Sequence, residues 1–165
     1  MTTIRGYEHG DLQACRDLWV ELTNHHRKIY GVDSIGGDDP GSQFDDHLVA
    51  VGPNRLWVAE VDERVIGLTG LIVDGTSGEV EPVVVTESER GRGFGKALLA
   101  RVINEARDAD IRLLSVRPVG RNSAALRFFH DAGFDVLGHI ETFMDLRGER
   151  VWVAGEEVAG RDFRF

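Results

Sequence analysis

The stretch from Arg90 to Lys96 alternates glycines with basic residues and reads RGRGFGK. It lies between an apolar run typical of a strand and an apolar run typical of a helix. Glycines let the backbone turn so that successive N–H groups point into one concavity, and the start of a helix adds a positive end. Arg90, Arg92 and Lys96 add full charges. The loop is therefore predicted to bind a pyrophosphate, and the alternative is a solvated glycine-rich connection.

Two well-known phosphate-binding motifs do not fit this loop. A Walker A loop needs a glycine where this chain has Arg90, and it needs Ser or Thr where this chain has Ala97. A dinucleotide-binding fingerprint needs a glycine where Lys96 stands. What remains is the pattern Arg-x-x-Gly-x-Gly, carried by Arg90, Gly93 and Gly95.

Two carboxylates precede the loop and could move a proton. Glu79 and Glu81 stand two residues apart in an expected strand, so both side chains are predicted on one face of it. An amine attacks a thioester only when it is neutral, and a carboxylate can accept its proton directly or through water. Either glutamate is a candidate general base, and the alternative is that one or both simply face solvent.

The elements that must position these residues follow from the periodicity of the apolar residues. Helices are expected at 11–30, 43–50, 97–106 and 122–132, with Asp11 as a candidate N-cap and Gly133 ending the last helix. Strands are expected at 2–7, 55–61, 65–73, 79–85, 111–116, 136–146 and 149–153. This order predicts one domain over residues 1–165, of the α/β (α+β) class, with a mixed, mostly antiparallel central sheet flanked by helices.

Composition excludes several classes of function. The net charge of −9 disfavours a grip on nucleic acid, which needs a basic face. Cys15 is the only cysteine, and the adjacent His25 and His26 cannot share a helix face as metal ligands, so no metal site is expected. No apolar run approaches the ~20 residues that span a bilayer, and no secretory leader is evident. A cytoplasmic protein without a membrane partner is the expectation.

The motifs from Glu79 to Phe134 resemble those of the GCN5-related N-acetyltransferase (GNAT) superfamily. Its loop signature follows the fourth strand and is matched by Arg90, Gly93 and Gly95, while Asn122–Phe134 is similar to its Asn-x-x-Ala…Tyr…Gly-Phe helix. The resemblance implies a sheet splayed between the fourth and fifth strands and acetyl-CoA as the acyl donor. It also implies direct transfer of the acetyl group to a primary amine of a small molecule or peptide.

The resemblance assigns roles to individual residues. Glu79 stands where many members carry the catalytic glutamate, and Glu81 shares its strand face. The cofactor contacts it implies are the strand residues Val83, Val84 and Val85, the loop residues Arg90, Gly91, Arg92, Gly93, Phe94, Gly95 and Lys96, and Asn122 beside the pantetheine arm. Phe129 replaces the tyrosine that often protonates the leaving thiolate, so it is expected only to pack beside the CoA sulfur. Pro82 cannot donate to a ladder and independently predicts a bulge or an unpaired edge.

Three questions stay open at the level of sequence. Without the tyrosine, a non-catalytic acyl-CoA-binding module of the same fold is the alternative to an N-acetyltransferase. The loop between the first two helices carries Asp33, Asp38 and Asp39, with Asp45 and Asp46 close behind it; this acidity suits a cationic acceptor, although a solvated loop explains it as well. Many members of the superfamily form homodimers, and the strands near Trp152 could supply an edge for one.

Overall fold

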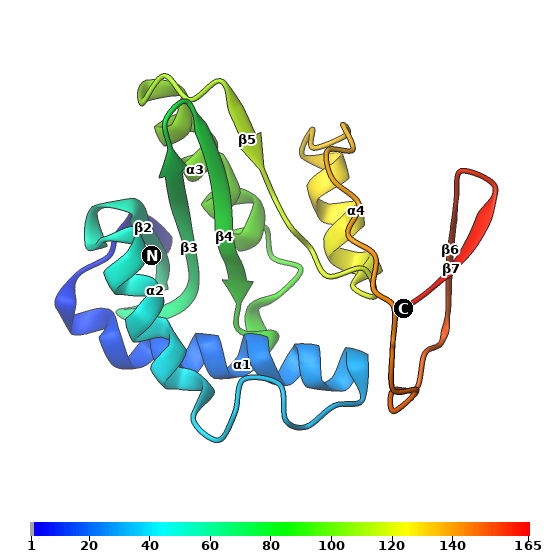
Figure 1. Cartoon of the computed structure of the whole chain (residues 1–165). Helices are drawn as coiled ribbons and strands as arrows, with labels where there is room; N and C mark the ends of the chain where they lie inside the picture. The colour runs from blue at the N-terminus through cyan, green and yellow to red at the C-terminus, as the bar shows by residue number, and fades with distance from the viewer. Residues whose placement is uncertain (1) are drawn as a thin grey trace. The chain divides into compact units, whose positions relative to one another are not determined.

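The computed structural model describes residues 2–165 and divides them into two compact units (Figure 1). One unit reaches to Val116, and the other comprises Arg117–Phe165. The first holds the sheet, three helices and the glycine-rich loop, and the second holds one helix and a two-stranded sheet. The expectation of one domain over the whole chain stays a prediction.

The first unit is built on a five-stranded sheet in the order β1-β2-β3-β4-β5. The first four strands pair antiparallel, and β5 pairs parallel to β4. This confirms the predicted mixed, mostly antiparallel sheet flanked by helices. The strands are β1 (Thr2–Gly6), β2 (Leu56–Val61), β3 (Arg64–Asp74), β4 (Ser77–Val85) and β5 (Leu113–Ser115).

Helices cover both faces of this sheet. On one face, α1 (Leu12–Tyr30) and α2 (Gln43–Val51) bury Leu18 and Phe44 against the strands. On the other face, α3 (Phe94–Asp108) buries Phe94 and Leu98. Short 3-10 turns connect these elements: η1 (His9–Asp11), η2 (Pro40–Ser42), η3 (Pro53–Arg55) and η4 (Glu87–Glu89). Along β4 the buried positions are Gly78, Val80, Pro82 and Val84.

A bulge interrupts β4 halfway along. Val80 pairs with Leu71 and Val83 pairs with Thr69, so Glu81 and Pro82 together oppose Gly70. The bulge that Pro82 predicted is therefore present. A Cβ on Gly70 would lie 2.6 Å from the Glu81 carbonyl oxygen, which explains why glycine stands opposite the bulge.

Asp11 occupies the predicted N-cap position of the first long helix, but it does not cap the helix with its side chain. Instead its carboxylate accepts hydrogen bonds from Arg5 at 2.7 and 2.9 Å and from the Glu8 N–H at 2.8 Å. A buried carboxylate gains more from a bidentate guanidinium than from one backbone N–H.

The second unit contains α4 (Ser123–Asp131) and the antiparallel pair β6 (Ala154–Val158) and β7 (Arg161–Arg164). The predicted helix over 122–132 is confirmed, and Gly133 follows it with a φ of 101°. The predicted strands over 136–146 and 149–153 are wrong, because neither range is extended in a ladder. Asp145 accepts hydrogen bonds from the N–H groups of Arg147, Gly148 and Arg150, a local turn that competes with strand pairing.

Candidate functional site

The second half of β4 has a backbone edge that no strand of residues 2–116 covers. The parallel ladder with β5 joins Ser77, Gly78 and Glu79 to Leu113–Ser115 and ends there, whereas β4 continues to Val85. The Thr86 N–H donates to the Ile66 carbonyl of β3 at 2.8 Å. Because successive residues of a strand direct their N–H groups to opposite edges, those of Val83 and Val85 point away from β3. Val84 turns its N–H to β3 and its side chain into the core.

The loop after β4 is tied back to this edge by Arg90. The Arg90 Nε donates to the Val85 carbonyl at 2.9 Å, and its backbone N–H approaches the Glu87 carbonyl at 3.4 Å. Arg92 pairs with Glu89, and its guanidinium carbon lies 5.5 Å from the centre of the Phe94 ring. The loop therefore follows the strand edge directly, with two guanidinium groups beside it.

Two glycines give the loop its conformation. Gly91 and Gly93 have φ values of 78° and 91°, a region that side chains with a Cβ rarely adopt. Gly93 occupies the N-cap position of α3 without any side chain to cap it, so the first N–H groups of this helix are available to an anion. Gly95 and Lys96 lie in the first turn, and Lys96 is exposed.

Phe94 has its side chain in the core rather than in the loop. It is 7% exposed and packs with Ala59, Ile66 and Leu98. The backbone of Phe94 is what this position can offer a ligand. Its ring anchors the start of α3 to the sheet.

The two candidate bases lie where β5 leaves β4. Glu79 is the last residue of the parallel ladder, where it pairs with Ser115, and on its other side it pairs with Ile72 of β3. Glu81 lies in the bulge opposite Gly70, and its side chain is exposed. Ile72 and Gly70 are two residues apart on β3, so the register assigns both glutamates to the face of the sheet that α1 and α2 cover.

His47 of α2 lies against the same bulge, and the sequence did not single it out. Its Nε2 would be 3.4 Å from a Cβ on Gly70, and its ring centre lies 4.9 Å from that of Trp19. Burial lowers the pKa of His47, and the Glu81 carbonyl opposes part of that effect. The Nε2 atom of His47 is buried, and it forms no hydrogen bond with any residue among 2–165. A histidine on an amphipathic helix has no sequence signal that reveals such a partner.

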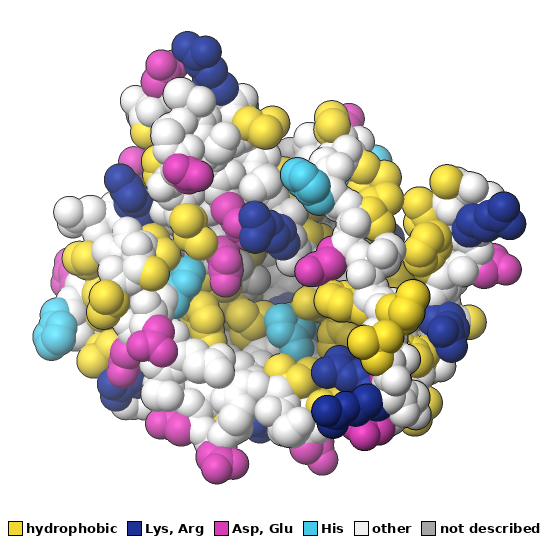
Figure 2. All heavy atoms as spheres, viewed as in Figure 1, with side chains coloured by type: hydrophobic (Ala, Val, Ile, Leu, Met, Phe, Trp, Pro, Cys, Tyr) yellow, Lys and Arg dark blue, Asp and Glu magenta, His cyan; other side chains and the backbone are white. Residues whose placement is uncertain are grey.

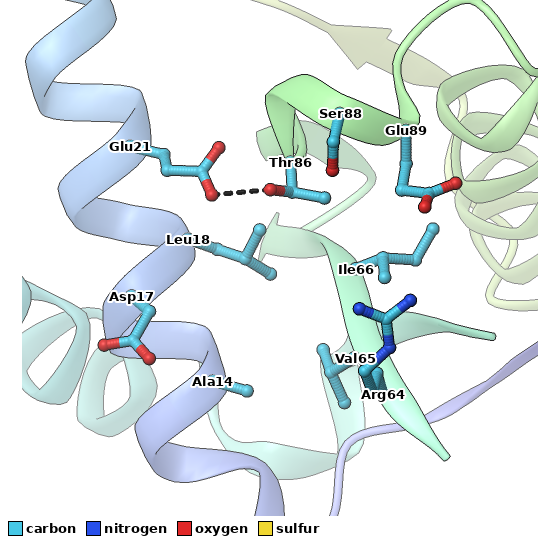
Figure 3. A pocket seen from close by; sticks show the side chains of 10 residues that line it. All are labelled: Ala14, Asp17, Leu18, Glu21, Arg64, Val65, Ile66, Thr86, Ser88 and Glu89. Atoms are coloured by element: carbon cyan, nitrogen blue, oxygen red, sulfur yellow. Dashed lines mark hydrogen bonds between the residues drawn. The ribbon is translucent and has the colours of Figure 1, made fainter. Parts of the chain in front are cut away.

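A pocket of about 200 Å³ lies between α1, the start of β3 and η4 (Figure 3). Residues of α1, the start of β3 and η4 line it, with Asp17, Glu21 and Glu89 among them. Glu89 is paired with Arg92, and Glu21 binds the start of η4. These carboxylates make the pocket unsuitable for a phosphate.

The remaining predicted site residues lie in the second unit. Asn122 caps α4, where its Oδ1 accepts a hydrogen bond from the Ala125 N–H at 3.0 Å. Phe129 packs edge-to-face on Phe128 and Phe134, with ring centres 5.1 and 5.9 Å away. The capping alternative for Asn122 is thus confirmed, and roles for Asn122 and Phe129 beside a cofactor stay predictions.

The acidic residues of the loop after α1 and of the first turn of α2 differ in their surroundings. Asp45 binds Arg16 at 2.5 and 2.9 Å, and Asp39 caps η2 by accepting from the Ser42 N–H. Asp33, Asp38 and Asp46 are exposed. Figure 2 shows acidic side chains spread over the lower edge of the view, where this loop runs. Asp39 and Asp45 therefore make structural contacts, whereas Asp33, Asp38 and Asp46 face solvent.

Three comparisons with known proteins agree with this geometry. The model of the acetyltransferase (GNAT) family matches residues 15–134. The chain belongs to this family. It is 25% identical over 143 residues to the L-methionine sulfoximine/L-methionine sulfone acetyltransferase of Salmonella typhimurium and, to the same extent, to the L-amino acid N-acyltransferase MnaT of Escherichia coli, covering 84% of this chain and 82% of each relative. The structure of yncA from Salmonella typhimurium with its cofactor acetyl-CoA superposes with a TM-score of 0.62 at 24% identity, over 81% of this chain and 79% of that one.

Membership of the family supports acyl transfer with an acyl-CoA donor. Among residues 2–165, no helix is long and apolar enough to cross a membrane. The same residues contain no group of three or more side chains suited to a metal ion. Cytoplasmic location, dimer formation and the absence of a nucleic acid partner stay predictions.

Proposed function

We propose that the protein is an acetyl-CoA-dependent N-acetyltransferase that moves an acetyl group directly to a primary amine of a small molecule or peptide. The observation that carries the proposal is the continuity of three features in one stretch of chain. The ladder with β5 ends at Glu79, an unpaired edge runs to Val85, and a glycine turn then leads into the first turn of α3. An extended ligand arm that ends in a pyrophosphate needs this succession.

The edge of β4 supplies the backbone groups for the arm and the thioester. The N–H groups of Val83 and Val85 point away from β3, so they can donate to pantetheine amides or to the thioester oxygen, as in strand addition. The loop N–H groups, the first turn of α3 and the side chains of Arg90, Arg92 and Lys96 then offer donors and charge to the pyrophosphate. As the amine attacks, negative charge on the thioester oxygen would be held by one of these backbone donors.

Glu81 precedes Val83 by two residues, which corresponds to at most about 7 Å, because the bulge shortens the advance of the strand. An amine that attacks a carbonyl held at the Val83 N–H would therefore lie within reach of Glu81 through one water. Glu79 lies four residues from Val83, at a greater distance along β4, but it stands at the position where many members of the family carry their base. Either carboxylate could accept the ammonium proton, and we propose that one of them does so.

The acceptor is proposed to be a small molecule with a primary amine. The two curated relatives are named for acyl transfer to amino acids or amino-acid analogues, which makes α-amino groups the first class to test. A solved structure of the same fold is an aminoglycoside N-acetyltransferase, at 17% identity and a TM-score of 0.65. Asp33 and Asp38, both exposed, favour a cationic approach to this side of the protein.

The test is to measure acetyl-CoA binding by calorimetry and then the release of CoA thiol with a panel of amines. The panel should contain L-methionine sulfoximine, L-methionine sulfone, common L-amino acids, an aminoglycoside, a polyamine and a lysine peptide. Binding followed by turnover with any of them, verified as an acetyl mass shift on the amine, is the expected result. Binding without turnover across the panel would favour the non-catalytic module, and binding of ATP in preference to acetyl-CoA would overturn the proposal.

The general base can be assigned with three variants. Glu79→Gln or Glu81→Gln should lower kcat by about 10²–10⁴-fold, because a positioned base contributes that much, while acetyl-CoA affinity changes little. Glu63→Gln in the turn between β2 and β3 removes the same charge away from the site and should leave kcat unchanged. Full activity in both site variants would refute a glutamate base.

A further inference from the structure

The short turn η4 joins the edge of β4 to the glycine-rich loop, and its beginning is capped in an unusual way. Thr86 occupies the N-cap position, where a threonine hydroxyl commonly accepts a backbone hydrogen bond. Here the Thr86 side chain makes no such bond. Its hydroxyl instead donates to a residue of another element.

That residue is Glu21 of α1, as the close view in Figure 3 shows. The Glu21 Oε1 accepts the Thr86 hydroxyl at 2.6 Å, and its Oε2 accepts the Glu87 N–H at 3.0 Å. One carboxylate therefore satisfies both the free hydroxyl and an otherwise uncapped N–H at the start of η4. Glu21 is half-buried, so solvent competes with these bonds only in part.

A short series of hydrogen bonds connects η4 to the glycine-rich loop. The Glu87 carbonyl receives the Arg90 N–H at 3.4 Å, and the Arg90 Nε returns to the Val85 carbonyl at 2.9 Å. Gly91 and Gly93 follow directly, with their positive φ values. Displacing the start of η4 therefore displaces the backbone that leads to the loop N–H groups.

We infer that Glu21 is a positioning residue for the acyl-CoA phosphate loop. It holds the loop backbone in its binding conformation before the cofactor arrives, although it does not itself touch the cofactor. This inference rests on the proposed function, since it assumes that the loop binds acyl-CoA. A loop that is ordered in advance binds more tightly because the ligand does not have to order it.

The negative charge of Glu21 makes this role specific. A carboxylate close to a phosphate-binding loop would repel its ligand if it were free, yet here both oxygens are engaged by donors from Thr86 and Glu87. Removing the side chain should thus weaken acyl-CoA binding through lost order. If Glu21 acted only as a nearby negative charge, its removal would strengthen binding.

The experiment compares Glu21→Ala with Asp17→Ala in the full-length protein, using acetyl-CoA as the probe. Asp17 lies one turn earlier on α1 and lines the same pocket, but its carboxylate accepts a hydrogen bond from Gln13 at 2.9 Å within the helix. The two substitutions remove the same charge from the same face. We expect Glu21→Ala to raise the Kd and the KM for acetyl-CoA about tenfold, which corresponds to ~1.4 kcal/mol, and Asp17→Ala to change them less than twofold.

Two further measurements separate positioning from general destabilisation. At saturating acetyl-CoA, kcat and the KM for the amine should stay within about twofold of the wild type in Glu21→Ala, because the reacting groups are unaltered. Thr86→Val removes the hydroxyl at nearly constant shape and should also raise the KM for acetyl-CoA, whereas Thr86→Ser, which keeps the hydroxyl, should restore it. If Glu21→Ala does not fold, the comparison of Thr86→Val with Thr86→Ser tests the same positioning role.

The outcomes distinguish this inference from the proposed function. Failure of the wild-type protein to bind acetyl-CoA overturns both. Wild-type binding with an unchanged or lower Kd in Glu21→Ala overturns the role of Glu21 alone. A fall in kcat and thermal stability without a change in the KM for acetyl-CoA would assign Glu21 a merely structural role and would likewise overturn it.

Discussion

Gly70→Ala is the substitution that tests most directly how the fold supports the site. Gly70 lies on β3 opposite the bulge that contains Glu81 and Pro82. An added Cβ would lie 2.6 Å from the Glu81 carbonyl oxygen, 2.8 Å from Leu56 Cδ2 and 3.4 Å from His47 Nε2. The first contact is with backbone, which cannot rotate away, and so the bulge itself must move.

The expected cost follows from these contacts. Forcing a methyl group into a packed site typically costs about 1–3 kcal/mol, and a backbone clash places Gly70→Ala in the upper half of that range. Replacing glycine also lowers the entropy of the unfolded chain, which returns about 0.4–1 kcal/mol. The net loss is thus about 1–2.5 kcal/mol. At roughly 2–4 °C per kcal/mol for a chain of this size, Tm should fall by about 2–10 °C.

Catalysis should suffer as well, because the displaced carbonyl belongs to Glu81 and Val83 lies two residues further on. A misplacement of about 1 Å can cost ~10²-fold in rate, so kcat/KM should fall tenfold or more at a temperature well below Tm. The matched control is Gly6→Ala on β1, where a Cβ would meet no atom within 4 Å. Thermal unfolding and steady-state kinetics of both variants would decide. Equal Tm and activity in the two variants would refute the argument from packing at the bulge.

Three other substitutions have defined outcomes. Gly93→Val should abolish measurable acetyl-CoA binding in calorimetry, since Gly93 has a φ of 91°. The control is Gly75→Val in the turn between β3 and β4, where the φ of 59° makes the variant strained but should leave binding intact. Normal affinity in folded Gly93→Val would be inconsistent with the loop assignment. Phe129→Tyr should change kcat by less than about tenfold, or ~1.4 kcal/mol of barrier, and a much larger gain would show that thiolate protonation limits the native enzyme. Burial opposes ionisation of Asp11, but the hydrogen bonds from Arg5 and the Glu8 N–H prevail and hold its pKa below the usual value of 3.8. The ion pair between Arg5 and Asp11 therefore stabilises the fold above pH 3.8, and this stabilisation is lost as the pH falls further. Tm should drop more between about pH 6 and about pH 3 in the wild type than in Asp11→Asn. Parallel profiles of Tm against pH would contradict this.

The elements of the first unit could be predicted because their signals are local. The period of the apolar residues predicted the helices and the first four strands, and Pro82 predicted the bulge, because a proline has no N–H to donate. Glycines between a strand and a helix likewise indicated the loop, where Gly91 and Gly93 take positive φ values. In each case one residue type has a physical property that few structures can accommodate otherwise.

The errors arise where the sequence carries no signal for the partner that a residue has in the fold. Asp11 is suitable as an N-cap, but Arg5 and Glu8 bind its carboxylate. Glu21 and His47 have no sequence signal of their own, since Glu21 accepts a backbone hydrogen bond from Glu87 of another element and His47 lies against Gly70 of another element. The sequence predicts a closing strand over 136–146, yet the segment forms no ladder, and its hydrophobic residues are exposed, such as Leu137 at 82%. In Figure 2, hydrophobic side chains gather over α4 and the C-terminal strands.

The unpaired half of β4 raises a problem that the bulge helps to solve. An exposed strand edge is a template on which any extended chain can pair, and proteins generally protect such edges. Here β4 is held by burial of Val80, Pro82 and Val84, so that the strand does not need a second ladder to stay in place. The bulge at Glu81 and Pro82 shifts the register of β4, which prevents a long foreign strand from pairing in register along the edge. The stretch left for pairing is Val83–Val85, and a short arm anchored by a pyrophosphate at the adjoining loop can use it where a polypeptide gains little. If this edge binds acyl-CoA as proposed, the bulge would therefore also favour an acyl-CoA arm over another protein chain.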